Sequence, residues 1–255
     1  MWQEIRTLNA IASTLFAVSA LLLFSAGTFW LMQRPMFMLK AVRVVSADAT
    51  QLRHVNRLTV KGAAIPRIKG NFFTSNLDAV RMAFEGVPWV RKAAVRREWP
   101  NKLVVTVEEH EPLGTWGENG RLLSVKGDVF TANLAEAEEN GGLPEFNGPD
   151  GAEKEVVARF GEFKQWFAPL RLAPESIQLS DRYAWTVKLN NGIAVELGRE
   201  QNKVMMRERV DRFVGIYPQL AALLQNRIES VDMRYPNGLA LKMSGMAPGL
   251  VSKRK

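Results

Sequence analysis

The feature that most constrains this chain is a long uncharged stretch near its N-terminus. No charged side chain occurs in residues 7–33, TLNAIASTLFAVSALLLFSAGTFWLMQ. A bilayer core needs about 20 predominantly apolar helical residues, so the stretch is long enough to cross it. Trp2 and Trp30 stand near its two ends, where aromatic side chains suit the headgroup layers. The sequence therefore predicts one transmembrane helix over residues 9–33.

A cleaved signal peptide is the alternative interpretation of this stretch. Ser25-Ala26-Gly27 offers a small-residue cleavage site. The apolar run continues past Gly27, however, and exceeds the usual signal-peptide core of about 7 to 15 residues. We therefore favour a retained anchor.

The charges that flank the anchor do not by themselves predict its orientation. Arg6 and the α-amino group precede it, whereas Arg34, Lys40 and Arg43 follow it, so a local positive-inside count does not favour a cytoplasmic N-terminus. Large C-terminal domains are translocated largely regardless of charge. We expect residues 1–8 to form a short cytoplasmic tail and the body of the chain to be exported.

Composition excludes several classes of site. The 255 residues are 47% hydrophobic, enough for one or two domains with a core, and carry a formal net charge of +8. This charge favours anionic surroundings such as membrane headgroups, acidic partner segments or nucleic acid. Cysteine is absent, which excludes disulfides, thiolate catalysis and Cys-ligated zinc.

Hydrophobic patterning predicts a small α+β unit after the anchor. A strand is expected at 39–46, a short helix within 51–70, and two strands at 89–99 and 103–112. A further helix, NLDAVRMAFEG, is capped by Asn76 or Ser75, ends at Gly86, and has an apolar face of Leu77, Val80, Met82 and Phe84.

From Gly114 onward the pattern becomes mainly β. A hairpin is predicted over 184–198, with a type I′ turn at Asn191-Gly192. Helical spacing marks 152–170, and two successive helices are predicted at 202–217 and 218–225. The first of these two carries the apolar residues Val204, Met205, Val210, Phe213 and Val214.

The last predicted element is a hairpin over residues 231–243, VDMRYPNGLALKM. One side of its first run carries Val231, Met233 and Tyr235, and its second run alternates through Leu239, Leu241 and Met243. No later strand in the sequence pairs with this second run, so its main-chain groups need another partner or a cover.

The chain has few residues suited to catalysis. His54 and His110 are its two histidines, and neither lies in a recognisable nucleophile motif. The stretch Glu108-Glu109-His110-Glu111 places at most two side chains on one strand face, whereas a zinc site requires three or four protein ligands. We favour a solvated strand end, and we predict no catalytic residues, no metal and no cofactor. An exported wall-acting enzyme with Glu108 and His110 as acid and base is the alternative.

A second cluster of interest mixes cations with aromatics. It consists of Arg91, Lys92, Arg96, Arg97 and Lys102 around Trp89 and Trp99. Such mixtures bind nucleic acid. Behind a membrane anchor, a solvated face or a docking surface for an acidic protein is favoured, and no nucleic-acid partner is expected.

Several segments resemble one family in a collinear order. PWVRKAAVRREWPNKLVVTVEEHEPLGTW (88–116) resembles the junction between the polypeptide-transport-associated (POTRA) domain and the β domain of the FtsQ/DivIB family of bacterial cell-division proteins. The segments GNFFTSNLDAVRMAFEGVPWV, LPEFNGPDG, WTVKLNNGIAVELGR, RFVGIYP and VDMRYPNG match in the same order. The resemblance spans essentially the whole chain.

This resemblance implies a non-enzymatic scaffold of the divisome in the bacterial inner membrane. The implied layout is a POTRA domain at 39–111, a β domain at 112–243 and a polar tail at 244–255. Implied partners are FtsB with FtsL at the β domain, and FtsK and other divisome proteins, including FtsW/FtsI, at the anchor and POTRA region. A membrane-anchored POTRA chaperone or transport module is the alternative; neither a β-barrel C-terminus nor tandem POTRA repeats, which would favour it, is visible.

The family also implies a binding site. FtsB adds a strand to the last strand of the β domain in this family. The corresponding positions are Arg199, Arg234, Tyr235, Asn237, Gly238, Leu239, Leu241 and Met243. The sequence departs from the family pattern at Pro236 and Met243.

Overall fold

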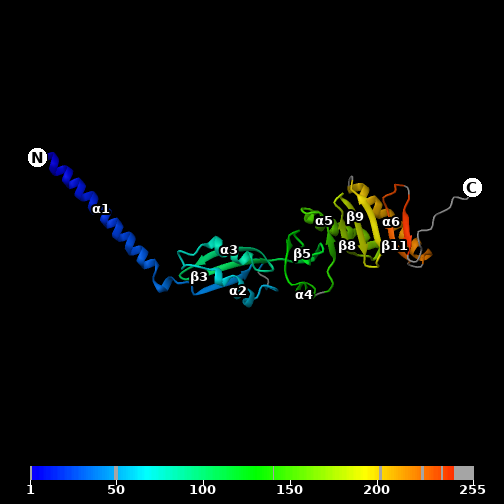
Figure 1. Cartoon of the computed structure of the whole chain (residues 1–255), viewed down its shortest axis with the longest axis horizontal. Helices are drawn as coiled ribbons and strands as arrows, with labels where there is room; N and C mark the ends of the chain where they lie inside the picture. The colour runs from blue at the N-terminus through cyan, green and yellow to red at the C-terminus, as the bar shows by residue number, and fades with distance from the viewer. Residues whose placement is uncertain are drawn as a thin grey trace, which may run out of the picture. The chain divides into compact units, whose positions relative to one another are not determined.

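The chain forms two compact units, and the boundary between them in the sequence lies between Glu109 and His110. We call residues 1–109 unit 1 and residues 110–255 unit 2 (Figure 1). The computed structural model describes residues 2–48, 51–139, 141–200, 203–224, 227–236 and 238–243. The predicted site residue Asn237 and the predicted tail 244–255 lie outside the described residues.

Unit 1 begins with one long helix, α1 (Trp2–Met32). Its segment Asn9–Met32 has a mean hydropathy of 2.0 and is not buried by the rest of the chain. By length and composition this segment can cross a membrane, as the uncharged stretch predicts. A short 3-10 turn, η1 (Pro35–Phe37), follows it.

The rest of unit 1 is a three-stranded sheet with helices, in the predicted β-α-α-β-β order. The sheet order is β1-β3-β2, with β1 parallel and β2 antiparallel to the central β3. The leucine and valine residues of β3 are buried, as expected for a central strand. The elements are β1 (Ala41–Ser46), α2 (Arg57–Ala63), η2 (Ile65–Arg67), α3 (Leu77–Glu85), β2 (Val90–Glu98) and β3 (Lys102–Glu109).

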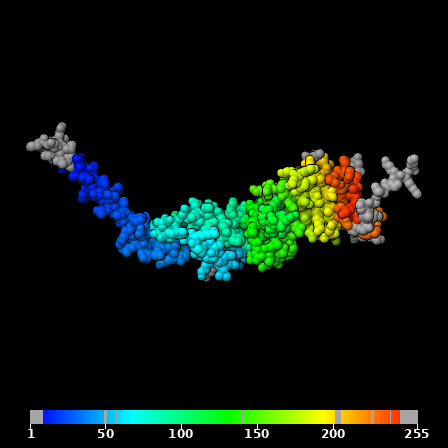
Figure 2. Space-filling view, viewed as in Figure 1, coloured from blue at the N-terminus to red at the C-terminus, as the bar shows by residue number. Residues whose placement is uncertain are grey.

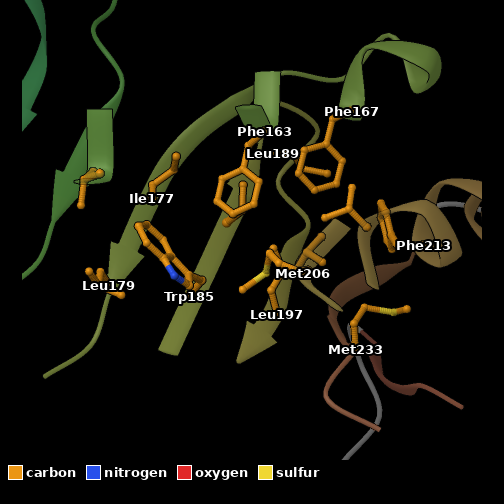
Figure 3. Close-up of a cluster of buried hydrophobic side chains, with 14 of the residues drawn as sticks. Phe163, Phe167, Ile177, Leu179, Trp185, Leu189, Leu197, Met206, Phe213 and Met233 are labelled. Carbon is orange, nitrogen blue, oxygen red and sulfur yellow. The ribbon is translucent and has the colours of Figure 1, made fainter. Parts of the chain in front are cut away.

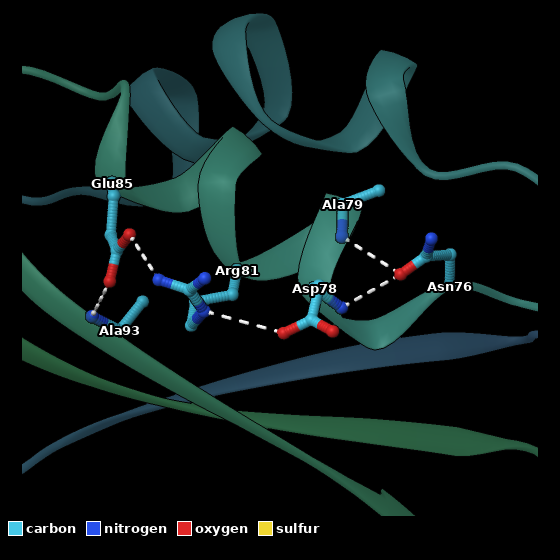
Figure 4. Close-up of polar contacts among 6 residues, drawn as sticks. All are labelled: Asn76, Asp78, Ala79, Arg81, Glu85 and Ala93. Carbon is cyan, nitrogen blue, oxygen red and sulfur yellow. Dashed lines mark hydrogen bonds and ion pairs between the residues drawn. The ribbon is translucent and has the colours of Figure 1, made fainter.

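The ends of α3 are set by local polar contacts (Figure 4). The Asn76 side chain accepts hydrogen bonds from the backbone N–H groups of Asp78 and Ala79, at 3.0 and 3.1 Å, and so caps the helix. Arg81 pairs with Glu85 at 2.8 Å, and the Glu85 carboxylate also accepts the N–H of Ala93 on β2 at 3.3 Å. These contacts fix α3 on the sheet.

The predicted apolar face of α3 is wrong at one position. Met82 is 64% exposed, whereas Ala83 is buried beside Val80 and Phe84. Residues three and four positions after Val80 share its face, and a residue two positions after it points away.

Unit 2 is built on one nine-stranded sheet in the order β12-β11-β10-β9-β8-β7-β4-β5-β6. Five neighbouring pairs are antiparallel and three are parallel, which confirms a mainly antiparallel β domain with helices. The strands are β4 (Pro112–Trp116), β5 (Arg121–Ser124), β6 (Val129–Phe130), β7 (Glu145–Asn147), β8 (Pro174–Leu179), β9 (Ala184–Leu189), β10 (Ala194–Arg199), β11 (Ile228–Asp232) and β12 (Ala240–Met243). The helices are α4 (Leu134–Ala137), α5 (Glu153–Phe167), η3 (Ala168–Leu170) and α6 (Lys203–Leu223).

The core of unit 2 lies between the sheet and helices α5 and α6 (Figure 3). Phe163 of α5 packs edge-on against Trp185 of β9, with ring centroids 5.9 Å apart, and Phe167 meets Phe213 of α6 at the same spacing. The alternating residues of the β9–β10 hairpin complete this core, as their pattern predicts. They are Trp185, Val187, Leu189, Ile193, Val195 and Leu197, and all are buried.

The turn of this hairpin differs from the predicted type I′ turn. Within the turn only Gly192 has a positive φ, 85°, and its N–H donates to the carbonyl of Leu189 at 2.8 Å. A type I′ turn also needs a positive φ at Asn191. The geometry is that of a three-residue loop in which glycine forms a bulge after the turn.

Helix α6 is one helix where the sequence pattern predicted two. It continues through Pro218 to Leu223. A proline inside a helix costs about 3 kcal/mol because it lacks an N–H and crowds the preceding turn. The continuous helix packs Tyr217 and Leu220 against the core, which offsets this cost. The sequence pattern placed Met205 on the apolar face of this helix, but the core contains its neighbour Met206 instead.

Candidate partner-binding edge

Strand β12 forms one edge of the unit 2 sheet. It pairs antiparallel with β11, with Leu241 opposite Val231 and Ala240 opposite Asp232. Figure 2 shows the orange-to-red segment that carries β11 and β12 on the outer side of the yellow β9–β10 hairpin. The other edge of the sheet is the two-residue strand β6. Of the two edges, β12 therefore offers the longer row of open main-chain groups.

The pairing of β11 with β10 shows which main-chain groups of β11 point toward β12. The N–H of Met233 donates to the carbonyl of Glu196 at 2.9 Å, within the parallel pairing of these strands. Met233 and Val231 therefore direct their main-chain groups toward β10. Because successive residues of a strand direct these groups to opposite sides, Asp232 directs its groups toward β12.

It follows that, among the residues that the structure describes, Leu239 and Leu241 carry the main-chain groups of the edge that have no partner strand. Ala240, opposite Asp232, directs its N–H and C=O back to β11. Leu239 and Leu241 flank Ala240, so their main-chain groups point away from the sheet. The side chains of both leucines are half-buried against the core, on the face that also holds the fully buried Val231. An added strand would thus meet open hydrogen-bonding groups beside partly open apolar side chains.

The turn that precedes β12 is held by an arginine of α6. Nη1 of Arg212 donates to the backbone carbonyl of Tyr235 at 3.0 Å and also to that of Pro236. The Tyr235 side chain is 55% exposed. Val231 and Met233 are buried, so the alternating run that they share with Tyr235 does not continue as a buried face to position 235. Strand β11 ends at Asp232, and these contacts turn the chain outward.

Arg234 is bound within the domain. Its Nε and Nη2 donate to the two carboxylate oxygens of Asp232 at 2.9 and 2.6 Å, and Nη2 lies 3.3 Å from Glu196. The hydrogen bond from the Arg234 side chain lowers the pKa of the Asp232 carboxyl below its ordinary value, although partial burial acts in the opposite direction. The Arg234 side chain remains 57% exposed, so an added acidic group can still reach it.

Gly198 makes room for the stem of Arg234. It is buried with φ at 73°, and a Cβ built on it would lie 2.7 Å from Cγ of Arg234. Glycine adopts this backbone conformation without steric cost. A side chain at position 198 would collide with Arg234.

Arg199 stands at the end of β10, on the same end of the sheet as Arg234. Its carbonyl and that of Leu197 accept hydrogen bonds from Nη1 of Arg209, at 2.9 and 2.6 Å. The Arg199 side chain is exposed and has no hydrogen bond or ion pair with the residues that the structure describes. It is the more available of the two predicted cations.

The remaining predicted residues also have defined places. Gly238 is exposed, with open space around its Cα. Met243 lies opposite Ile228 at the far end of β12 and is half-buried. The predicted set therefore runs from the turn, along the outer edge, to the end of β12.

Three residues that shape this edge were missed by sequence reasoning: Arg209, Arg212 and Asp232. Arg209 and Arg212 are three positions apart, a spacing that places them on one helical face. That spacing was the available signal. The carbonyls that Arg212 contacts lie more than twenty positions later in the chain. That contact depends on how α6 crosses over the sheet, which the sequence spacing does not reveal.

Two family profiles match the chain over the regions just described. The profile "POTRA domain, FtsQ-type" matches residues 49–110, and the profile "Cell division protein FtsQ/DivIB, C-terminal" matches residues 114–234. Similar curated proteins carry the name "Cell division protein FtsQ". The one from Burkholderia pseudomallei is 50% identical over 96% of each chain, and that from Bordetella pertussis is 40% identical over 100% of this chain and 97% of its own.

The chain belongs to the FtsQ/DivIB family of cell-division proteins. Its POTRA domain lies in unit 1, and its FtsQ/DivIB C-terminal domain lies in unit 2.

In this FtsQ/DivIB chain, the acidic stretch around His110 makes structural contacts. The Glu109 carboxylate accepts the backbone N–H groups of Arg53, His54 and Val55 at 2.8, 3.0 and 2.6 Å. Glu108 pairs with Arg91 at 3.1 Å, whereas His110 belongs to unit 2. No group of three or more potential metal ligands occurs among the residues that the structure describes.

The cluster of cations and aromatics is not one surface. Trp89 is buried and stacks on His54, with ring centroids 3.9 Å apart. Arg97 donates to the backbone carbonyls of Phe72 and Ser75 at 2.6 and 2.8 Å. Trp99, in contrast, is 72% exposed. The buried members of the cluster therefore serve the POTRA fold.

Proposed function

We propose that this chain is a bitopic inner-membrane scaffold of the divisome that receives a strand of FtsB, paired with FtsL, at β12. The observation that carries the proposal is the open edge of β12, where Leu239 and Leu241 direct their main-chain groups away from the sheet. Strand addition uses such groups for affinity and alternate side chains for specificity. The half-buried leucines provide the adjoining apolar surface.

Main-chain pairing alone does not give tight binding. Each hydrogen bond contributes about 0.5 to 1.5 kcal/mol net. The exposed ring of Tyr235 supplies an aromatic anchor next to the edge, the residue type that often dominates binding energy. Arg199, without an internal partner among the described residues, attracts an acidic segment of the partner. Arg234 gives up part of its contact with Asp232 and Glu196 to bind the same segment. Asn237, Gly238 and Met243 complete the proposed contact surface.

The proposed arrangement in the cell follows from the anchor. Residues 1–8 are the cytoplasmic tail, 9–33 the membrane span, 39–111 the periplasmic POTRA domain, 112–243 the β domain and 244–255 a polar tail. The anchor and POTRA region contact FtsK and other divisome proteins, including FtsW/FtsI, at the division septum. The role is non-enzymatic, and it is supported by the structural use of Glu108 and Glu109 within the fold.

A pair of proline variants tests strand addition in the full-length chain. Leu241→Pro removes an N–H that points to the open edge, whereas Lys242→Pro removes one that points to β11. We expect Leu241→Pro to abolish capture of FtsB with a small change in thermal unfolding, and Lys242→Pro to lower the unfolding temperature clearly. Leu241→Ala, which keeps the N–H, controls for the lost side chain. Wild-type capture by Leu241→Pro would reject strand addition at this edge.

Depletion and complementation test the cellular role. Depletion of this protein in its host should give filaments without septa. The double variant Glu108→Gln/His110→Gln should restore division, because neither side chain has a catalytic role in the proposal. Failure of the correctly folded double variant would favour an enzyme.

A further inference from the structure

The end of the POTRA domain next to α1 exposes apolar side chains. Met36 is 57% exposed, Met38 60%, Phe73 40% and Trp99 72%. Two of these residues lie just after α1, and the other two lie in the turns after η2 and between β2 and β3. Large exposed apolar side chains gathered at one end of a domain indicate a contact surface.

Hydrogen bonds bring these separate turns together at the exit of α1. The Asn71 side chain donates to the carbonyl of Met32, the last residue of α1, at 2.9 Å. The N–H of Phe72 donates to the carbonyl of Phe37 at 2.9 Å, and the Phe37 and Phe73 rings meet edge-on at 4.9 Å. The turn with Phe73 therefore lies directly at the end of the anchor.

The β2–β3 turn is tied to the same place. The Asn101 side chain donates to the carbonyl of Met36 at 3.4 Å, and the carbonyl of Asn101 accepts the N–H of Lys40 at 3.0 Å. Trp99 is two residues from Asn101. Arg97 holds the turn of Phe73 onto β2 through its bonds to the carbonyls of Phe72 and Ser75. The segments that carry the four apolar side chains are thus held together by hydrogen bonds.

Cations surround this surface. They are Arg34, Lys40, Lys69 and Lys102, and all four are exposed. Arg34 also stacks over Trp30 near the end of α1, 3.5 Å from the ring centroid. The acidic residues at this end are Glu98, which lies opposite Lys102 in the β2–β3 register, and Asp78 in the first turn of α3. The excess charge is positive.

We propose that this anchor-proximal surface, formed by Met36, Met38, Phe73 and Trp99 with the four cations, inserts into the headgroup layer of the bilayer that α1 crosses and binds anionic lipid. Tryptophan and other large apolar side chains partition into this layer, and nearby Lys and Arg bind anionic headgroups. The surface follows a membrane span within a few residues, so the bilayer is the occupant that connectivity places beside it. The inference rests on the proposed anchor.

Such insertion would fix the POTRA domain relative to the membrane. The sheet direction from Ala41 and Lys102 toward Ser46 and Val107 leads away from this end. Insertion would therefore hold the start of β1 at the bilayer and keep its other end in the aqueous phase.

The absence of cysteine allows a direct test with single labels. Full-length protein carrying Trp99→Cys, Asp48→Cys or Leu21→Cys is labelled with an environment-sensitive fluorophore and reconstituted in phosphatidylcholine vesicles with or without phosphatidylglycerol. Lipids with a nitroxide near the headgroup or deep in the acyl chain report depth. Asp48 lies just past the far end of β1 and is exposed, so it serves as the matched position.

We expect the label at position 99 to emit at shorter wavelength and to be quenched by the shallow nitroxide, while the label at 48 stays aqueous. Lys40→Gln and Lys102→Gln should each lower the inserted-to-free ratio about fivefold in anionic vesicles. Lys92→Gln, at the opposite end of β2, should leave the ratio unchanged.

Four outcomes would contradict the inference, in whole or in part. If the labels at 99 and 48 behave alike while the label at 21 is quenched by the deep nitroxide, α1 spans the bilayer but the POTRA surface does not insert. A blue-shifted label at 99 that lipid nitroxides do not quench indicates a protein contact instead. A label at 21 that is not quenched contradicts the anchor itself, and with it both proposals. Equal insertion in neutral and anionic vesicles would reject the lipid-charge component.

Discussion

Nη1 of Arg212 donates a hydrogen bond to the backbone carbonyl of Tyr235 at 3.0 Å, which joins helix α6 to the turn before β12. Arg212→Met keeps much of the side-chain volume but removes this contact and the one to Pro236. A lost hydrogen bond to a charged donor costs about 1.5 to 3 kcal/mol, reduced here by solvent. We expect FtsB binding to fall roughly tenfold and amide exchange after Tyr235 to accelerate. Lys188→Gln, in an exposed pair on β9, is the control. Unchanged exchange would contradict the role of Arg212.

Tyr235 tests the aromatic anchor separately from the turn. Its ring is 55% exposed, so Tyr235→Ala should leave the unfolding temperature nearly unchanged. An aromatic hot spot contributes about 2 kcal/mol or more, so FtsB binding should weaken by about thirtyfold. Tyr235→Phe, which retains the ring, should lose far less. Calorimetry with purified FtsB–FtsL measures both effects, and equal binding by all three proteins would exclude Tyr235 from the interface.

The pair of Asp232 and Arg234 predicts a pH-dependent stability difference. The hydrogen bond from Arg234 lowers the folded-state pKa of the Asp232 carboxyl, so its stabilisation is present above the unfolded pKa, about 3.9, and is lost as pH falls through the folded pKa. Arg234→Gln should therefore lower stability near neutral pH by at most about 1 kcal/mol, because Arg234 is largely exposed. The unfolding temperatures of the variant and wild type should converge in acid. A difference that persists below the folded pKa would point to packing over Gly198 instead.

Alanine substitutions at two glycines distinguish the destabilisation that comes from backbone strain from that caused by a steric clash. Gly198 and Gly192 have φ of 73° and 85°, so alanine is strained at both, by about 1 kcal/mol. A Cβ at 198 also collides with Arg234, whereas one at 192 meets open space. Gly198→Ala should thus be destabilised by a further 1 to 3 kcal/mol, roughly, and should bind FtsB more weakly. Equal unfolding midpoints in urea would show that Arg234 moves aside freely.

Glu109 predicts an effect confined to the POTRA domain. Its carboxylate accepts three backbone N–H groups, from Arg53, His54 and Val55. Glu109→Gln leaves one oxygen to accept them, at a cost of about 1 to 3 kcal/mol. Hydrogen exchange should rise across residues 53–55 while unit 2 stays protected. Glu111→Gln, whose side chain is exposed, is the neighbouring control.

Periodicity predicted those parts of the fold in which local pattern and burial agree. The uncharged stretch predicted α1, and the alternation of Trp185, Val187 and Leu189 predicted a core hairpin. The pattern failed where a tertiary contact overrides a local preference. Pro218 lies inside α6 because neighbouring residues gain core packing, and Tyr235 turns outward because Asp232 and Arg212 hold the backbone around it.

The candidate edge could be located in the sequence but not described there. Leu239, Leu241 and Met243 were identifiable as the last alternating run. Which of them present open main-chain groups depends on the parallel pairing of β10 with β11, which residues almost forty positions apart establish. No local pattern encodes that pairing.

The position of β12 gives the proposed scaffold role an order of assembly. β12 follows every other described strand in the chain, and it rests on β11, which reaches β10 only after α6 has crossed over the core. A partially exported or half-folded copy therefore lacks the edge at which we propose that FtsB binds. If FtsB binds there, its binding reports that the domain behind the edge has folded completely.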